Sequence, residues 1–195
     1  MSNMIKSKLQ DVKRLLILEE AAKLFETAGF EQLKITDLAK TVGVSVGTIY
    51  GLFDSKEGLY MAYVKQQIAD FLEELEQRCE RVATPDERLQ QAFLLKFSHF
   101  VSKRKAVEEC AKNNPLFFSN IRHSEPEILE RVYAKIAGFV REIRPEIDEE
   151  GALELAYQFS GLSDGYLAYW LNHDGDLLSK VPLLRAQMMT MIKGY

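Results

Sequence analysis

Apolar residues recur every three or four positions along most of the chain, a spacing that predicts amphipathic helices rather than strands. One helix is expected from Ser7 to Ala28, ended by Gly29, with an inner face of Ile17, Ala21, Leu24, Phe25 and Ala28. Another follows Phe53, and further helices are expected over residues 35–41, 46–52, 86–104, 105–113, 125–143, 148–172 and 177–193. The pattern therefore predicts an all-α protein of about nine helices.

Two parts of different size are expected: a three-helix head over residues 1–53 and a larger helical body over residues 54–195. The helix that opens the body can be capped by Asp54 or Ser55, and Asp54 and Glu57 have the spacing of a capping box. In the helix over 86–104, the residues expected to face inward are Leu89, Phe93, Phe97, Phe100 and Val101.

The net charge of −4 argues against a protein that coats nucleic acid non-specifically. Residues 1–60 hold eight basic and eight acidic residues, whereas residues 61–195 hold 17 basic and 21 acidic ones. Any DNA contact is therefore expected from cations clustered on one face of the head. No stretch has the apolar length of a membrane span or a signal segment, so a cytoplasmic protein without membrane contact is expected, with Cys79 and Cys110 as free thiols.

The stretch from Lys34 to Lys56 has the pattern of a helix-turn-helix. Gly43 stands where the turn needs a positive φ, and the small Ala39 lets the second helix cross close to the first. Ser45 stands at the N-cap of the second helix, where its hydroxyl can accept a backbone N–H. A core shared by the two helices is expected from Ile35, Leu38, Val44 and Ile49.

In such a unit the second helix enters the major groove of DNA with its N-terminal residues foremost. Here that helix presents small residues and hydroxyl groups, namely Ser45, Val46, Gly47, Thr48, Tyr50 and Gly51. Hydroxyl groups can reach phosphates, and Lys56 begins the next helix, where an ammonium and helix-terminal N–H groups favour a phosphate. Other interpretations stay open at this point: Gly-Thr-Ile-Tyr also suits a strand, the Ala39–Gly43 pair also suits core packing, and Lys56 also suits a solvated surface charge.

The head resembles the N-terminal domain of the TetR family of transcriptional regulators. The resemblance covers about 45 residues and runs through Ile17-Leu18, Ala21, Leu24-Phe25, Gly29, Leu38-Ala39, Gly43-Val44-Ser45, Gly47-Thr48-Ile49-Tyr50, Phe53 and Ser55-Lys56-Glu57-x-Leu59. It implies a homodimer that binds a double-stranded DNA operator and leaves it when a small molecule enters the body. It also implies phosphate contacts by Thr48, Tyr50 and Lys56, and bases nearest to Val46, Gly47 and Gly51.

The chain departs from the family pattern in both helices of the unit. Leu33 and Lys34 stand where the family often has two threonines, so the usual hydroxyl cap and phosphate contact are absent. Lys34 can replace that contact by its charge, and Thr36 can assist it. Gly51 and Leu52 replace larger aromatic or basic residues, which removes expected base contacts.

The helix over 148–172 is apolar nearly all round, so it needs cover on every side. It contains Gly161 and Gly165, and since each mid-helix glycine costs about 1 kcal/mol relative to alanine, we expect another backbone to approach there. We expect a homodimer through a four-helix bundle made with the helix over 177–193; the alternative is a single chain with a thick core. The interface is expected to contain Leu153, Gly161, Gly165, Tyr169, Leu184 and Met188.

The middle of the chain is rich in aromatic residues, which indicates an apolar or aromatic effector. Candidate effector contacts are Phe97, Phe100, Phe118, His123, Tyr133 and Tyr157. Because no Glu-x-x-His pair, Gly-rich phosphate loop or nucleophile motif is present, we expect neither an enzyme nor a metal or cofactor. The sequence favours a repressor released from a palindromic operator by a small effector; the alternative is a helix-turn-helix regulator controlled by a protein partner.

Overall fold

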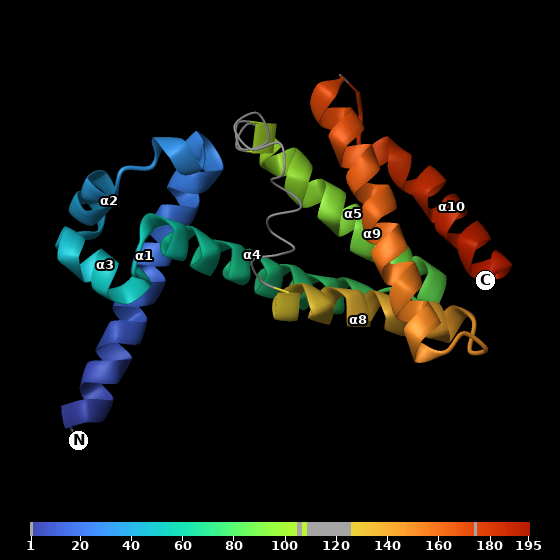
Figure 1. Ribbon diagram of the computed structural model, residues 1–195, viewed down its shortest axis with the longest axis horizontal. Helices are drawn as coiled ribbons and strands as arrows, with labels where there is room; N and C mark the ends of the chain where they lie inside the picture. Colours follow the sequence, from blue (N-terminus) through green and yellow to red (C-terminus); the bar gives the residue numbers. More distant parts are fainter. Residues whose placement is uncertain (1, 105–106, 109–125, 174) are drawn as a thin grey trace. The chain divides into compact units, whose positions relative to one another are not determined.

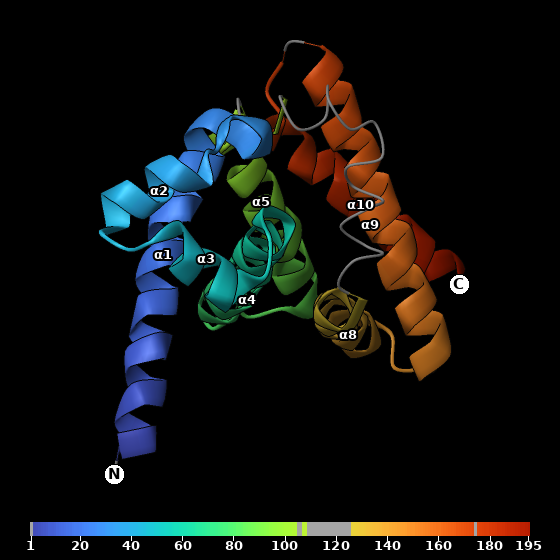
Figure 2. The same ribbon diagram turned by 60° about the vertical axis from the view of Figure 1, so that its left-hand side comes forward.

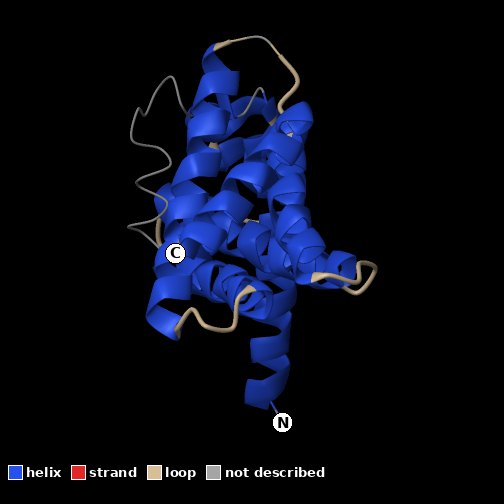
Figure 3. Ribbon diagram, turned by 90° about the vertical axis from the view of Figure 1, so that its right-hand side faces the viewer, coloured by secondary structure: helices blue, strands red, loops and turns tan. Residues whose placement is uncertain are grey.

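The computed structural model describes residues 2–104, 107–108, 126–173 and 175–195, and every regular element in those ranges is helical (Figure 3). The all-α expectation is therefore confirmed. Figure 1 shows the helices, which are α1 (Ser2–Gln32), α2 (Ile35–Val42), α3 (Val46–Phe53), α4 (Lys56–Cys79), α5 (Pro85–Ser102), α8 (Pro126–Ile143), α9 (Glu149–Asn172), a 3₁₀ turn η1 (Leu178–Lys180) and α10 (Val181–Gly194). None of the described helices is long and apolar enough to cross a bilayer.

Two compact units make up the chain: one contains residues 2–67 and 107–108, and the other contains residues 68–104 and 126–195 as far as they are described. The boundary between the units falls within α4, after Gln67, so Leu59 and Tyr63 near the start of that helix belong to the head. The boundary expected between residues 53 and 54 separates a DNA-binding part from an effector-binding and dimerisation part, and it stays a prediction.

The helix expected over 177–193 instead opens with the 3₁₀ turn η1, and α10 begins only at Val181. The other helix bounds agree with the expected ranges except at α1. This helix begins at Ser2 instead of Ser7. Gly29 breaks it with φ 80° and ψ 172°, as a glycine stop would, but helical backbone resumes beyond it as far as Gln32. The short helix expected over 105–113 lies outside the described residues, apart from 107–108.

The first unit, the head, consists of α1, α2, α3 and the beginning of α4. Figure 2 shows α2 and α3 lying against α1. Side chains that are fully buried in this unit include Ile17, Leu38, Ile49 and Leu59. The face expected for α1 and the core shared by the two short helices are therefore present in the main, but Leu24, Ala28 and Val44 are only half-buried. Close ring contacts join the end of α1 to the start of α4: the Tyr60 ring lies 5.1 Å from that of Phe25 and 5.2 Å from that of Phe30.

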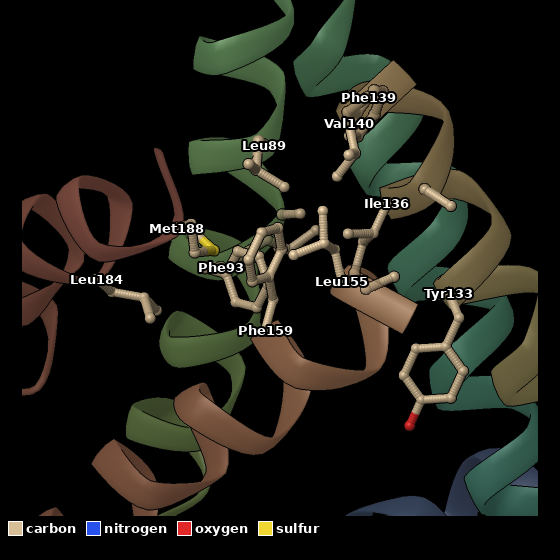
Figure 4. Packing of buried hydrophobic residues seen from close by; sticks show 14 of the residues in the cluster. Leu89, Phe93, Tyr133, Ile136, Phe139, Val140, Leu155, Phe159, Leu184 and Met188 are labelled. Atoms are coloured by element: carbon tan, nitrogen blue, oxygen red, sulfur yellow. The ribbon is translucent and has the colours of Figure 1, made fainter. Parts of the chain in front are cut away.

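The second unit, the body, is built on contacts of α9 with α8 and of α5 with α8 and α10. Figure 4 shows its core, in which Phe93 of α5 and Phe159 of α9 are almost fully buried beside Leu155. Val101 was expected to face inward but is 38% exposed; it lies in the last turn of α5, one residue before the helix ends.

Side-chain bonds fix the helix ends of the body. Thr84 caps α5 in a reciprocal capping box with Glu87, whose pKa is lowered by the Thr84 N–H and hydroxyl. Asp148 caps α9 by accepting the Gly151 N–H at 2.8 Å. Arg185 of α10 binds the Asp86 carboxylate at the start of α5, which lowers the pKa of Asp86. The capping box of Thr84 with Glu87 was not predicted, although the two residues have the required spacing in the sequence.

Candidate functional site

The turn between α2 and α3 has the geometry that the sequence predicts. Gly43 follows α2 with φ 73° and ψ 34°, the left-handed conformation, and its N–H donates to the Lys40 carbonyl at 3.3 Å. A Cβ at this position would meet no atom within 4 Å, so glycine is needed here for its backbone angles and not for space. Ala39 is buried at the crossing of the two helices.

The N-terminus of α3 is closed by two hydroxyl groups. The Oγ of Ser45 accepts the Thr48 N–H at 3.0 Å, which confirms the expected cap. The same Oγ lies 2.8 Å from the hydroxyl of Thr48, so one of the two hydroxyl groups donates to the other. Whichever donates, the accepting hydroxyl keeps its own proton, which can be offered to a phosphate oxygen of DNA.

The outer face of α3 is small and open. Gly47 and Gly51 are exposed, and a Cβ on Gly51 would meet no atom of a described residue within 4 Å outside the adjoining backbone of α3. Tyr50 between them is 43% exposed, whereas Val46 is half-buried. Since neither glycine is required by packing within the head, this face leaves the backbone accessible to an external partner.

At the start of α2, Lys34 and Thr36 are both exposed. Lys34 occupies the N-cap position in an extended conformation, and no side chain caps the helix there. This confirms the expectation that α2 has no hydroxyl cap, since Lys34 stands where the family often has a threonine. The exposed ammonium of Lys34 adds a positive charge at the N-terminus of α2, where the first backbone N–H groups lack partners within the helix.

Lys56 makes contacts within the head that the sequence did not indicate. Its ammonium donates to the Glu31 carbonyl at 3.2 Å and lies 4.5 Å from the centre of the Phe30 ring. These contacts hold the last turn of α1, beyond the break at Gly29, against the start of α4. An ammonium has three protons, so a phosphate contact by Lys56 requires one of those left or a rearrangement of the side chain.

The junction of α3 and α4 corrects one expectation. Ser55, not Asp54, caps α4, because its Oγ accepts the Gly58 N–H at 2.9 Å. Asp54 instead ends α3 with φ 64°, so the expected capping box of Asp54 with Glu57 does not form. Gly58 was missed: a Cβ there would lie 2.0 Å from the Phe53 carbonyl oxygen, so this position admits only glycine.

The candidate effector residues lie in different surroundings within the body. Phe97 and Tyr133 are buried in its core, and Phe100 packs against that core while half-buried. Tyr157 is 40% exposed, stacks on Tyr133 with ring centres 4.1 Å apart and donates its hydroxyl to Glu130. Phe118 and His123 lie outside the described residues.

The candidate interface residues separate into two groups. On α9, Gly161, Gly165 and Tyr169 are exposed, and Leu153 is half-buried. Leu184 and Met188 of α10 were expected at the interface, but both are fully buried; Figure 4 shows Met188 beside Phe93, in the core of the same chain. They are therefore core residues of a single body and are not available to a partner.

A groove of about 580 Å³ runs along the exposed side of α9, η1 and α10. It is lined in part by apolar and aromatic side chains, and Gly165 is one of its lining residues. Tyr169 is 62% exposed and Leu183 53% exposed at this groove, so two large apolar side chains here face outward from the chain.

Comparison with known proteins agrees with these features. Residues 17–63 match the family model described as bacterial regulatory proteins of the tetR family. The fatty acid metabolism regulator protein of Bacillus subtilis is 31% identical over 77 residues, which are 40% of this chain and 40% of that protein, so the match spans less than half of the relative. The transcriptional activator FasR of Mycolicibacterium smegmatis is 23% identical over 171 residues, which are 85% of this chain and 75% of that protein.

Among solved structures, the transcriptional regulator FadR from Bacillus subtilis in complex with stearoyl-CoA has a similar fold, with a TM-score of 0.68 and 22% identity. The superposition covers 89% of this chain and 96% of that one. The likeness in fold thus extends beyond the head to the helices of the body.

Proposed function

Since the chain belongs to the TetR family of bacterial regulatory proteins, we propose that it is a transcriptional repressor that binds a palindromic DNA operator through α3 and is released by a small apolar effector. The observation that carries DNA binding is the pairing of the Gly43 turn with the Ser45 cap, which fixes α3 with its small outer face exposed. Thr48, Tyr50 and Lys34 supply hydroxyl and ammonium groups for phosphates, and Val46, Gly47 and Gly51 let the backbone approach the bases.

The glycines of α9 support a homodimer. Among the described residues, no atom apart from the adjoining backbone of α9 lies within 4 Å of a Cβ built on Gly161 or Gly165, so the described packing explains neither of them. Two mid-helix glycines weaken a helix by about 2 kcal/mol in total, a loss that a closely packed second copy would offset. The exposed Tyr169 and Leu183 at the adjoining groove supply apolar area for such an interface.

An apolar effector is supported by the aromatic core of the body and by the ligand of the similar FadR structure, stearoyl-CoA. Phe97, Phe100, Tyr133 and Tyr157 are the described side chains that we assign to its surroundings. Fatty acyl chains are the first class of effector to test, because they contain a long apolar part. The similar Bacillus subtilis protein is a fatty acid metabolism regulator, and the similar FadR structure holds stearoyl-CoA.

Release follows from a shift between two shapes of the protein. In a dimer bound to DNA, two recognition helices must lie about 34 Å apart, one turn of the duplex. An effector that binds better to a body shape incompatible with this spacing lowers the population of the DNA-binding shape. The connection is α4, which passes from the head at Lys56 into the body at Cys79 as one helix.

The test is selection of a random duplex library by the purified chain at fixed moderate salt, followed by sequencing of the retained duplexes. Enrichment of a palindrome with constant half-site spacing is expected. If nothing is enriched, and Tyr50→Phe protein retains the same duplexes as the parent, the proposed DNA-binding function is wrong.

A further inference from the structure

The carbonyl groups at the end of α3 reveal a contact that comes from far along the chain. The last carbonyls of any helix lack partners within it. At the end of α3, the Tyr50 carbonyl accepts the Asp54 N–H at 2.8 Å and the Phe53 carbonyl accepts the Ser55 N–H at 2.7 Å. The Leu52 carbonyl accepts a proton from the guanidinium of Arg14, which lies 38 residues earlier on α1.

Arg14 also stacks on the residue next to that carbonyl. Its guanidinium carbon lies 4.5 Å from the centre of the Phe53 ring, and Phe53 is buried in the core of the head. A guanidinium is planar and presents donors at its edge, so it can stack on a ring and donate to a carbonyl at once. A lysine ammonium cannot match both contacts with the same geometry.

The charge of Arg14 complements a deficiency of α3 itself. The last turn of α3 contains no basic residue, although the partial negative charge at a helix C-terminus favours a cation there. The helix has only eight residues and ends in Asp54, the one residue other than glycine with a positive φ in the described part of the chain. A helix so short and so abruptly ended depends on outside contacts to keep its direction.

We infer that Arg14 is a positioning residue for DNA recognition: it holds the C-terminal end of α3 against α1 and thereby sets the direction in which the recognition helix meets the bases. Ser45 fixes one end of α3, and Arg14 fixes the other. Arg14 uses its charge within the head and does not contact a phosphate. This inference rests on the proposed DNA-binding function of α3.

The consequence is a defined pattern of binding. A positioning contact affects discrimination between sequences, since base contacts depend on the direction of α3, whereas general attraction to the phosphates is unchanged. A residue that contacts a phosphate behaves differently: its loss weakens binding to all duplexes and lowers the dependence of log affinity on log salt by about one.

The experiment compares Arg14→Met, Arg14→Lys and the parent full-length chain on the duplex enriched by the parent and on an unrelated duplex of equal length, over a range of salt. Arg14→Met is expected to lose about three- to tenfold of affinity for the enriched duplex, with unchanged affinity for the unrelated duplex and an unchanged salt slope. The affinity of Arg14→Lys for the enriched duplex is expected to lie between those of Arg14→Met and the parent chain. Lys13→Met, the same change at the neighbouring exposed cation, is the control and is expected to retain the discrimination of the parent.

Two results would overturn the inference: Arg14→Met that discriminates as well as the parent, or equal losses on both duplexes with a salt slope reduced by about one, which would make Arg14 a phosphate contact. Circular dichroism reports whether the variants fold, and if Arg14→Met loses helix, Arg14→Lys decides by the same criteria. A parent chain that discriminates between no duplexes would refute the proposed function itself, an outcome distinct from the other two.

Discussion

The head and the body hold their functional residues in different ways. In the head, the residues that shape α3 are short-range and polar: Gly43 bends the chain, Ser45 caps the helix and Thr48 bonds to that cap. In the body, the residues proposed for the effector and the dimer are mostly apolar, and the same chemistry forms the core. Local hydrogen bonds can therefore be predicted from the residues that make them. The role of an apolar side chain, in contrast, depends on which residues pack against it.

The largest expected effect falls on the core of the body. Phe159→Ala removes a fully buried ring, and the lost burial and remaining cavity are expected to lower the free energy of unfolding by about 3–5 kcal/mol. Urea unfolding followed by circular dichroism measures it. Tyr169→Ala, at a ring of the same body that is 62% exposed, serves as the control and is expected to change the stability of one chain little. A loss under about 1 kcal/mol for Phe159→Ala would contradict the core described here.

The next effect separates surface from core within α9. Gly165→Leu is expected to convert the proposed dimer to a monomer at micromolar concentration, because the new side chain would separate the two backbones that we propose to approach each other at this glycine. It should not unfold the chain, since a Cβ at this position meets no atom within 4 Å. Sedimentation velocity measures the change.

The matched control is Gly138→Leu on α8, which also replaces an exposed mid-helix glycine without neighbours within 4 Å. Gly138→Leu is expected to leave the oligomeric state unchanged. A dimer that persists in Gly165→Leu, or a parent chain that sediments as a monomer, would remove α9 as the interface.

Two caps of similar strength test the comparison directly. Ser45→Ala in the head and Thr84→Ala in the body each remove the side chain that accepts an N–H at a helix start, and each is expected to cost about 1 kcal/mol of stability. Only Ser45→Ala is expected to weaken binding to the enriched duplex, because Ser45 belongs to the proposed DNA-binding unit and Thr84 does not. Fluorescence anisotropy at fixed salt measures the affinity, and an equal loss in Thr84→Ala would show that general stability, not the geometry of α3, controls binding.

The smallest effect is a dependence on pH that belongs to the body alone. Arg185 lowers the pKa of Asp86 below its ordinary value of 3.8, so the folded state gains stability above that value and loses it as the pH falls through the lowered pKa. Both side chains are a quarter or more exposed, which limits the contribution to under about 1 kcal/mol. Asp86→Asn is expected to reduce stability near neutral pH and to flatten its acid loss, measured as urea midpoints between about pH 6 and pH 3. An acid loss as steep as in the parent would assign it to other carboxylates.

Local signals allowed much of the head to be predicted. The positive φ of Gly43 and the cap of Ser45 follow from residue type and spacing, and the bounds of α2 and α3 lie within one residue of those expected. The choice of Ser55 over Asp54 did not follow, because the backbone at Asp54 is determined by the end of α3. Arg14 could not be found from spacing, since its partner carbonyl lies 38 residues away.

The body was predictable as helices but not as surfaces. Leu184 and Met188 have the same apolar spacing as interface residues would have, and only packing shows that they belong to the core of one chain. Gly161 and Gly165 were singled out because a glycine inside a helix has a known cost, and their place at an interface stays a prediction. Which aromatic residues surround an effector depends on the effector itself. No local sequence pattern distinguishes such residues from aromatic residues of the core.

The most direct test of the account is release of the enriched duplex, followed by fluorescence anisotropy, when stearoyl-CoA or coenzyme A without an acyl chain is added at equal concentration. We expect stearoyl-CoA to release the duplex and coenzyme A to leave it bound, because the proposed effector site in the body binds the apolar acyl chain. A duplex that stays bound in both cases, or that is released equally by coenzyme A, would contradict a repressor controlled by an apolar effector of the acyl type.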